Sequence, residues 1–309
     1  MKRTLLATLM LATGASAPAM SAHHECDGDL FTMNAGRGDV GVLVDVDEGS
    51  ARAGGDYFTT APLRATLNSR ALFSASAMAY DSTTDRIYYA STPTPQSYHI
   101  AETNNGDFTD EEFQALGLHA NALKPFRLAY YDVQAGTHHD VGTTRFEIKR
   151  MTFDPDTNTL YGSDRARLFT IDPSNADQST IGLLDASIRI AGFTNWGDFV
   201  FSDGDLLFVT NTRAFSIDTR DASSQLEFFH KIDLVTAATL DQNGEILVTS
   251  KSHNVSGSPN TTNLWLLDPP AVQGDFAPEA YGGLVPMRVD AMSMVDSGTN
   301  ECYPPQFVD

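Results

Sequence analysis

The stretch MTFDPDTNTLYGS, from Met151 to Ser163, places an acidic turn between two short apolar runs. Asp, Asn, Ser and Gly favour such a turn because they cap their own backbone or tolerate its left-handed conformations. The same phrase recurs along the chain. Its other copies are MAYDSTTDRIYYAS (Met78 to Ser91), FVFSDGDLLFVTN (Phe199 to Asn211), ATLDQNGEILVTS (Ala238 to Ser250) and, truncated, MSMVDSGTNECY (Met292 to Tyr303). The sequence therefore predicts a β-hairpin that repeats.

Each complete hairpin is followed by a second pair of strand-like runs. These pairs are FRLAYYDVQAGTHHDVG (Phe126 to Gly142), RLFTIDPSNADQSTIG (Arg167 to Gly182), RAFSIDTRDASSQLEFF (Arg213 to Phe229) and NLWLLDPPAVQGDF (Asn263 to Phe276). Four strands per unit is the composition of a β-propeller blade. Successive acidic turns are about 38 to about 73 residues apart, which fits a unit near 40 residues that carries insertions.

The two ends of the chain supply complementary halves of one more unit. LFTMNAGRGDVGVLV (Leu30 to Val44) resembles the second half of a blade, and the stretch from Met292 is a first half without a second. Joined together they make a composite blade that closes the ring. We therefore expect an all-β propeller of five four-stranded blades, with six as the alternative if Glu48 to Ser76 contains a further blade.

These repeats resemble the β-propeller superfamily of exported proteins with degenerate aromatic-Asp blade repeats, of the YVTN, lactonase-like and quinoprotein-like kind. The resemblance covers nearly all of the chain after the N-terminal segment. The Trp-Asp dipeptide and Gly-His pair of WD40 blades are missing. The resemblance implies a fold that hosts many unrelated functions, so the function has to be argued from a site.

Residues 1–22 have the pattern of an export signal. Lys2 and Arg3 precede an apolar run, and small residues follow it, with cleavage predicted after Ala19 or Ala22. The apolar run is shorter than the roughly 20 residues that span a bilayer. We therefore expect a single propeller domain over residues 23–309, located in the periplasm or outside the cell, without an integral membrane segment.

Cys26 and Cys302 lie close to the two ends of that domain. In an oxidising compartment such a pair is predicted to form a disulfide, and here it would clasp the composite blade. By chain-entropy reasoning a loop of this length contributes about 4–5 kcal/mol.

The formal charge of the chain is −20, and removal of Lys2 and Arg3 with the signal makes it −22. Nucleic acid and anionic membranes require a positive surface, so they are not expected partners. The expected partner is a protein or a small-molecule ligand.

Three stretches exceed what blades require: Glu48 to Ser76, Thr92 to Lys124 and Lys251 to Asn263. The second contains a predicted helix from Thr109 to Leu116, with Thr109 and Glu112 at capping-box spacing. Blade topology predicts that all three emerge on one face and the acidic turns on the other. Loops on a rigid scaffold often carry function, so the insertion-bearing face is the predicted binding face.

Candidate functional residues follow from that face. His99, His119 and His253 fall in its loops and could together bind a divalent metal or act as acid and base. Trp196 and Trp265 could line a ligand pocket. His23 would become an N-terminal copper ligand after cleavage at Ala22.

The acidic turn residues, and the calcium-like spacing of DPDTN from Asp154 to Asn158, are interpreted as turn caps. No cofactor motif, nucleophile elbow or phosphate-binding loop is evident. The sequence therefore favours a binding or scaffold protein that acts through the insertion-bearing face. The alternative is a lactonase-like or lyase-like enzyme with a metal or His/Asp site at the channel mouth.

Overall fold

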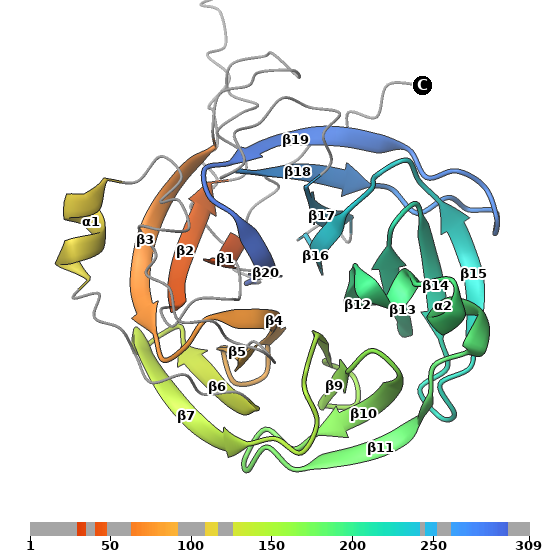
Figure 1. Ribbon diagram of the computed structural model, residues 1–309, viewed down its shortest axis with the longest axis horizontal. Coiled ribbons are helices and arrows are strands. Elements are labelled where there is room, and N and C mark those ends of the chain that lie inside the picture. The colour runs from red at the N-terminus through yellow and green to blue at the C-terminus, as the bar shows by residue number, and fades with distance from the viewer. Residues whose placement is uncertain are drawn as a thin grey trace, which may run out of the picture.

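The computed structural model describes residues 30–34, 41–47, 63–91, 109–116, 126–241, 245–251 and 261–295. These residues form five four-stranded antiparallel sheets arranged in a ring, which is a five-bladed β-propeller (Figure 1). The prediction of five blades is confirmed. No helix in the described part of the chain has the length and apolar character needed to cross a membrane.

Four blades are each built from consecutive strands. Blade 1 contains β4 (Ala75–Asp81), β5 (Arg86–Ser91), β6 (Arg127–Asp132) and β7 (Thr137–Thr143). Blade 2 contains β8 (Arg150–Asp154), β9 (Thr159–Ser163), β10 (Arg167–Ile171) and β11 (Gln178–Leu183). Blade 3 contains β12 (Asp198–Ser202), β13 (Asp205–Thr210), β14 (Arg213–Ile217) and β15 (Ser224–Phe229). Blade 4 contains β16 (Val235–Leu240), β17 (Ile246–Ser250), β18 (Thr262–Leu267) and β19 (Glu279–Val285).

The fifth blade joins the two ends of the chain. Its strand order is β20 (Val289–Met294), β1 (Leu30–Asn34), β2 (Gly41–Asp47) and β3 (Arg64–Ala71). β20 and β1 pair antiparallel, with Leu30 opposite Met294. The predicted composite blade is therefore confirmed.

One part of that prediction needs correction. Glu48 to Ser76 was expected to exceed what the blades require, yet it contains β3, the outer strand of the composite blade. Only residues 72–74 separate β3 from β4. The sequence pattern does not indicate β3, because most residues of RATLNSRA are exposed or half-buried and few of them are apolar. The stretch preceding it connects β2 to β3 within one blade.

The first strand of every blade lines the central channel. β4, β8, β12, β16 and β20 each contact the corresponding strands of the two neighbouring blades. Apolar side chains fill the gaps between blades: Tyr88 and Phe169, for example, lie between blades 1 and 2, and Phe199 and Phe208 between blades 2 and 3. The channel wall therefore rests on cores that surround it.

The outer strands pack on turns of the next blade. A Cβ atom added at Gly142 in β7 would lie 2.9 Å from the Asn175 carbonyl oxygen, and one added at Gly182 in β11 would lie 2.4 Å from that of Asp221. Glycine is needed at both positions because the neighbouring backbone occupies the space of a side chain.

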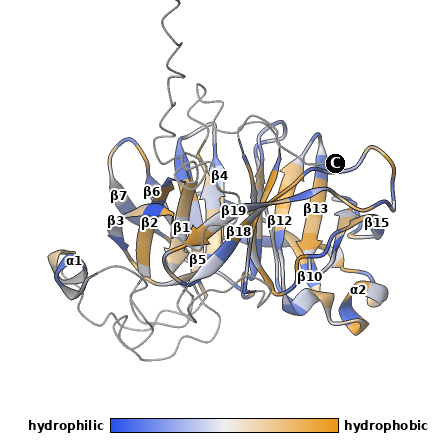
Figure 2. Ribbon diagram, turned by 90° about the horizontal axis from the view of Figure 1, so that it is seen from above, coloured by the Kyte–Doolittle hydropathy of each residue, from blue (hydrophilic) through white to orange (hydrophobic). Residues whose placement is uncertain are grey.

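Two described helices lie on one face of the disc. Figure 2 shows α1 (Asp110–Ala115) and α2 (Ala186–Ile190) at the same edge of the side view. In α1 the Thr109 N–H donates to Glu112 Oε2 at 2.7 Å, and the Glu112 N–H donates to Thr109 Oγ1 at 3.2 Å. The predicted capping box is confirmed.

Candidate binding site

The acidic turns connect the first and second strands of the blades, on the face of the disc opposite the helices. Asp81 accepts hydrogen bonds from the backbone N–H groups of Thr83 and Thr84, and Asp154 accepts them from those of Asp156 and Thr157. These carboxylates are buried and engaged in their own turns. The capping interpretation is confirmed for both, and DPDTN is the turn between β8 and β9. Asp203 differs, because it adopts a φ of 52° and supplies left-handed backbone to its turn instead of a cap.

A cavity of about 220 Å³ occupies the channel at this acidic-turn end. All five inner strands contribute to its wall. The lining residues are Met78, Ala79, Tyr80, Ser82, Met151, Thr152, Phe153, Pro155, Phe199, Val200, Phe201, Ala238, Thr239, Leu240, Asp241, Ser293 and Met294. Ser82, Pro155 and Asp241 belong to or adjoin the turns, so the cavity opens on the turn face.

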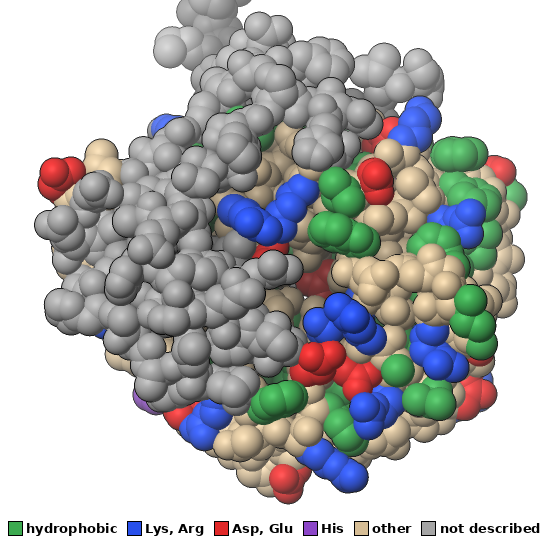
Figure 3. All heavy atoms as spheres, in the orientation of Figure 1, with side chains coloured by type: hydrophobic (Ala, Val, Ile, Leu, Met, Phe, Trp, Pro, Cys, Tyr) green, Lys and Arg blue, Asp and Glu red, His purple; other side chains and the backbone are tan. Residues whose placement is uncertain are grey.

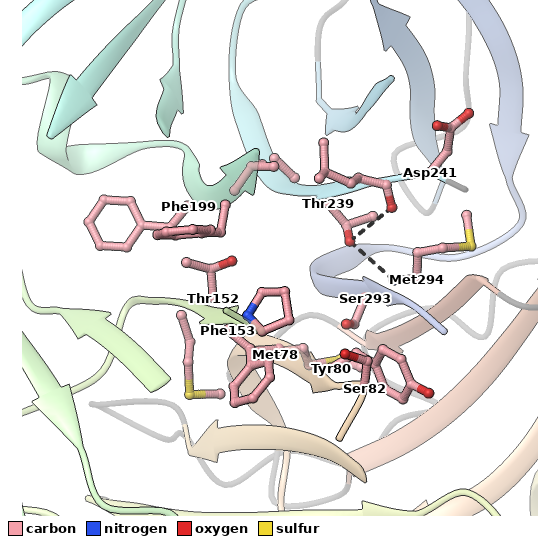
Figure 4. Close-up of a pocket in the computed structure, with 17 residues that line it drawn as sticks. Met78, Tyr80, Ser82, Thr152, Phe153, Phe199, Thr239, Asp241, Ser293 and Met294 are labelled. Atoms are coloured by element: carbon pink, nitrogen blue, oxygen red, sulfur yellow. Dashed lines mark hydrogen bonds between the residues drawn. The ribbon is translucent and has the colours of Figure 1, made fainter. Parts of the chain in front are cut away.

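The cavity wall combines apolar and hydroxyl side chains. In Figure 4, Thr152 lies on one side of the cavity and Thr239 and Ser293 lie on the other, whereas the Asp241 side chain points away. Thr239 Oγ1 accepts the Met294 N–H at 3.1 Å, a bond that joins β16 to β20. Aromatic rings, methionine side chains and a few hydroxyl groups are the usual composition of a small-molecule pocket.

A buried carboxylate, that of Asp198, lies against residues of the cavity wall. Asp198, the first residue of β12, is 1% exposed, and its Oδ1 accepts the N–H groups of Phe199 at 2.9 Å and Met151 at 3.4 Å. The Ala238 N–H of β16 also bonds to this carboxylate. Backbone groups of three blades therefore hold Asp198 in place. Its Oδ2 is buried and has no hydrogen-bond partner among the described residues.

A buried guanidinium lies near this carboxylate. Arg150, the first residue of β8, donates to Ser163 Oγ and to the carbonyl oxygens of Asp164, Thr194 and Trp196. Its guanidinium also stacks 4.7 Å from the Phe208 ring centroid. Its two terminal nitrogens are used by these oxygens, and Arg150 offsets the Asp198 charge through space.

Burial shifts the pKa values of Asp198 and Arg150 in opposite directions. Burial raises the pKa of Asp198 to about 7, against the lowering effect of its backbone hydrogen bonds and of Arg150. Burial also lowers the pKa of Arg150 to about 10. The carboxylate beside the cavity wall therefore changes charge near neutral pH.

The two predicted tryptophans lie elsewhere. Trp196 follows the short helix η3 (Phe193–Asn195), and its carbonyl oxygen accepts bonds from Arg150 and Thr210. The Trp265 indole N–H donates to Ser250 Oγ at 3.0 Å, and its ring lies edge-on to Tyr281. Neither lines the cavity, and their predicted part in ligand binding stays a prediction.

The remaining predicted site residues lie outside the described part of the chain. They are His23, Cys26, His99, His119, His253 and Cys302. Within the described ranges, no three His, Cys, Asp or Glu side chains gather closely enough to hold a metal ion.

The sequence analysis missed the cavity and its carboxylate. The sequence pattern does not distinguish the residues just before the acidic turns from core residues, although several of them line the cavity. One signal was available: where the first strands of three blades have Ala77, Ala237 and Ala291, blades 2 and 3 have Arg150 and Asp198. Charged residues in place of alanine on an inner strand indicate a special position.

Comparisons with known proteins give only distant structural likenesses. No protein-family model matches the chain, and no curated protein matches it. A chain of the nidogen/laminin complex aligns over 85% of this chain and 97% of its own length, with 8% identity and a TM-score of 0.42. A chain of the hydrazine synthase of Kuenenia stuttgartiensis aligns over 86% and 69%, with 12% identity and a TM-score of 0.37.

Proposed function

We propose that this protein is a binding protein that holds a small molecule in the cavity at the acidic-turn end of its channel. The observation that carries the proposal is the cavity wall, to which the inner strands of all five blades contribute. Those strands rest on buried cores, so the site is formed before a ligand arrives and little ordering is needed on binding. The net charge of −20 favours ligands that are neutral or cationic.

A blocking variant tests this proposal. Ser82 is exposed in the turn between β4 and β5 and lines the cavity, so Ser82→Trp should narrow its mouth without touching a core. Ser187→Trp, on the exposed side of α2 at the opposite face, is the matched control. We expect fragments detected by saturation-transfer NMR to bind the wild type and Ser187→Trp and to be lost in Ser82→Trp. Fragments that persist in Ser82→Trp, or an absence of binding to the wild type, would contradict the proposal.

The insertion-bearing face is a second proposed binding surface, for a protein partner. Its support is the placement of α1 and α2 on one face, opposite the acidic turns. Deletion of the α1 segment should abolish capture of such a partner while leaving ligand binding in the cavity unchanged. The proposal includes export to the periplasm or the medium, which N-terminal sequencing of the secreted protein tests.

The enzyme alternative is a lactonase-like or lyase-like propeller with a metal or a His/Asp site at the channel mouth, for which His99, His119 and His253 are the candidate residues. Those histidines lie outside the described residues. Metal analysis of the purified protein tests this alternative directly.

A further inference from the structure

The two carboxylate oxygens of Asp198 differ in their hydrogen bonding. Oδ1 accepts the N–H groups of Phe199 and Met151, whereas Oδ2 lies buried with no hydrogen bond within ordinary distance and angle limits to a described residue. A buried polar atom without a partner is costly, and such an atom in a folded protein requires an explanation. The two terminal nitrogens of the Arg150 guanidinium donate to carbonyl and hydroxyl oxygens and not to Oδ2, and the Arg150 Nε is likewise buried without a partner among the described residues. Oδ2 therefore has room for a donor that the chain itself does not supply.

The position of Asp198 connects this oxygen to the cavity. Met151 and Phe199, whose N–H groups hold Oδ1, are themselves part of the cavity wall, as is Ala238. The carboxylate thus lies next to the cavity wall. Met78 and Met151 also line the cavity wall, and both are nearly fully buried.

The cavity wall suits a positively charged group. Tyr80, Phe153 and Phe201 contribute aromatic rings, which attract cations through their π faces. No Lys or Arg belongs to the wall as described. An ionised carboxylate in a water-excluded site forms its strongest hydrogen bonds with charged donors. A ligand with an ammonium group would satisfy Oδ2 and offset the buried charge together.

We propose that the ligand of this cavity is a small organic amine whose ammonium group donates a hydrogen bond to Asp198 Oδ2. This inference rests on the proposed binding function of the cavity and adds the chemical class of the ligand. Asp198 is a binding residue in this proposal, and the ring or chain attached to the ammonium group occupies the apolar part of the cavity.

The experiment compares benzylamine with benzyl alcohol, which has nearly the same shape and no charge. Affinities are measured by isothermal titration calorimetry on the wild type, on Asp198→Asn and on Asp205→Asn. Asp198→Asn keeps the Oδ1 acceptor and removes the charge, whereas Asp205 is exposed at the start of β13 and lies outside the cavity. We expect the wild type and Asp205→Asn to bind benzylamine at least tenfold more tightly than benzyl alcohol, and Asp198→Asn to lose this preference.

A pH series on the wild type supplies a second measurement that needs no variant. Arg150 on β8 is the charged group that faces Asp198, and β16 contributes only the Ala238 N–H. Because the pKa of Asp198 is about 7, its carboxylate becomes neutral below that pH while benzylamine stays protonated. Benzylamine affinity should therefore fall as the pH drops below about 7, and benzyl alcohol affinity should not.

The outcomes separate the two proposals. Equal binding of the amine and the alcohol to the wild type, or an amine preference that survives in Asp198→Asn, would overturn the assignment of Asp198 and leave the cavity as a binding site. Binding of neither probe to the wild type would overturn both.

Discussion

Acidification should weaken this fold through His230, a buried histidine between blades 3 and 4. His230 is 2% exposed. Its Nδ1 accepts the Ile232 N–H at 3.2 Å, so the ring proton resides on Nε2, which faces the Arg213 carbonyl oxygen at 3.3 Å. A second proton on Nδ1 would point at the Ile232 N–H. Burial lowers the pKa of His230 to about 4, below the usual value of 6.5.

The sign and size of the effect follow from that difference. Between pH 6.5 and about 4 the unfolded chain takes up a proton at this histidine and the folded chain does not. The unfolding free energy therefore falls as the pH falls through this window, and the contribution is intact above it. A pKa difference of this size corresponds to a loss of up to about 3 kcal/mol of unfolding free energy.

The variant His230→Gln isolates this contribution. Glutamine keeps one acceptor and one donor but takes up no proton, so the stability difference between wild type and variant should shrink on acidification. Urea unfolding at several pH values between neutral and about 4 measures that difference. His139→Gln, at an exposed ring stacked on Tyr130, is the control and should leave the pH dependence unchanged. A difference between wild type and His230→Gln that stays constant over this window would refute the reasoning.

Four further predictions concern stability. Asp198→Asn should change the pH dependence of stability in the opposite direction. As the pH falls below about 7, the wild type should gain stability relative to the variant, because Asp198 takes up its proton at a higher pH in the folded state than in the unfolded state. Urea unfolding of the two proteins measures this. Arg150→Met should lower the unfolding free energy by about 3–5 kcal/mol. The substitution removes the donors to the Thr194 and Trp196 carbonyl oxygens and leaves the charge of Asp198 without compensation. An unchanged thermal midpoint would contradict this prediction. Asp154→Ala should cost roughly 0.5–2 kcal/mol through its lost turn bonds while ligand affinity stays the same, as calorimetry would show. Cys26 and Cys302 should be joined, so that mass spectrometry of the unreduced protein finds no free thiols and Cys302→Ala lowers the thermal midpoint.

The propeller could be predicted from sequence because its repeat is local. Each hairpin carries its own turn signal, and the likeness of Leu30 to Val44 to a blade half indicated how the ring closes. β3 could not be predicted in the same way, since an outer strand exposed to solvent needs few apolar residues. The cavity arises only when the inner strands meet around the axis, and neighbouring positions in one strand do not reveal it. Asp198 stood out only as a charge where three other blades have alanine.

The pairing of β20 with β1 also constrains the order in which this chain can fold. Leu30 emerges from the ribosome long before its partner Met294, because more than 260 residues separate them. Single blades can form as they are made, but the ring cannot close until the last strand is available. Pairing of segments so distant in sequence is slow because the entropy of closing the loop is lost before the contacts form. Until β20 arrives, the edge of β1 that it will pair with stays exposed and can pair with strands of other chains. A chaperone that covers this edge during synthesis would prevent such pairing.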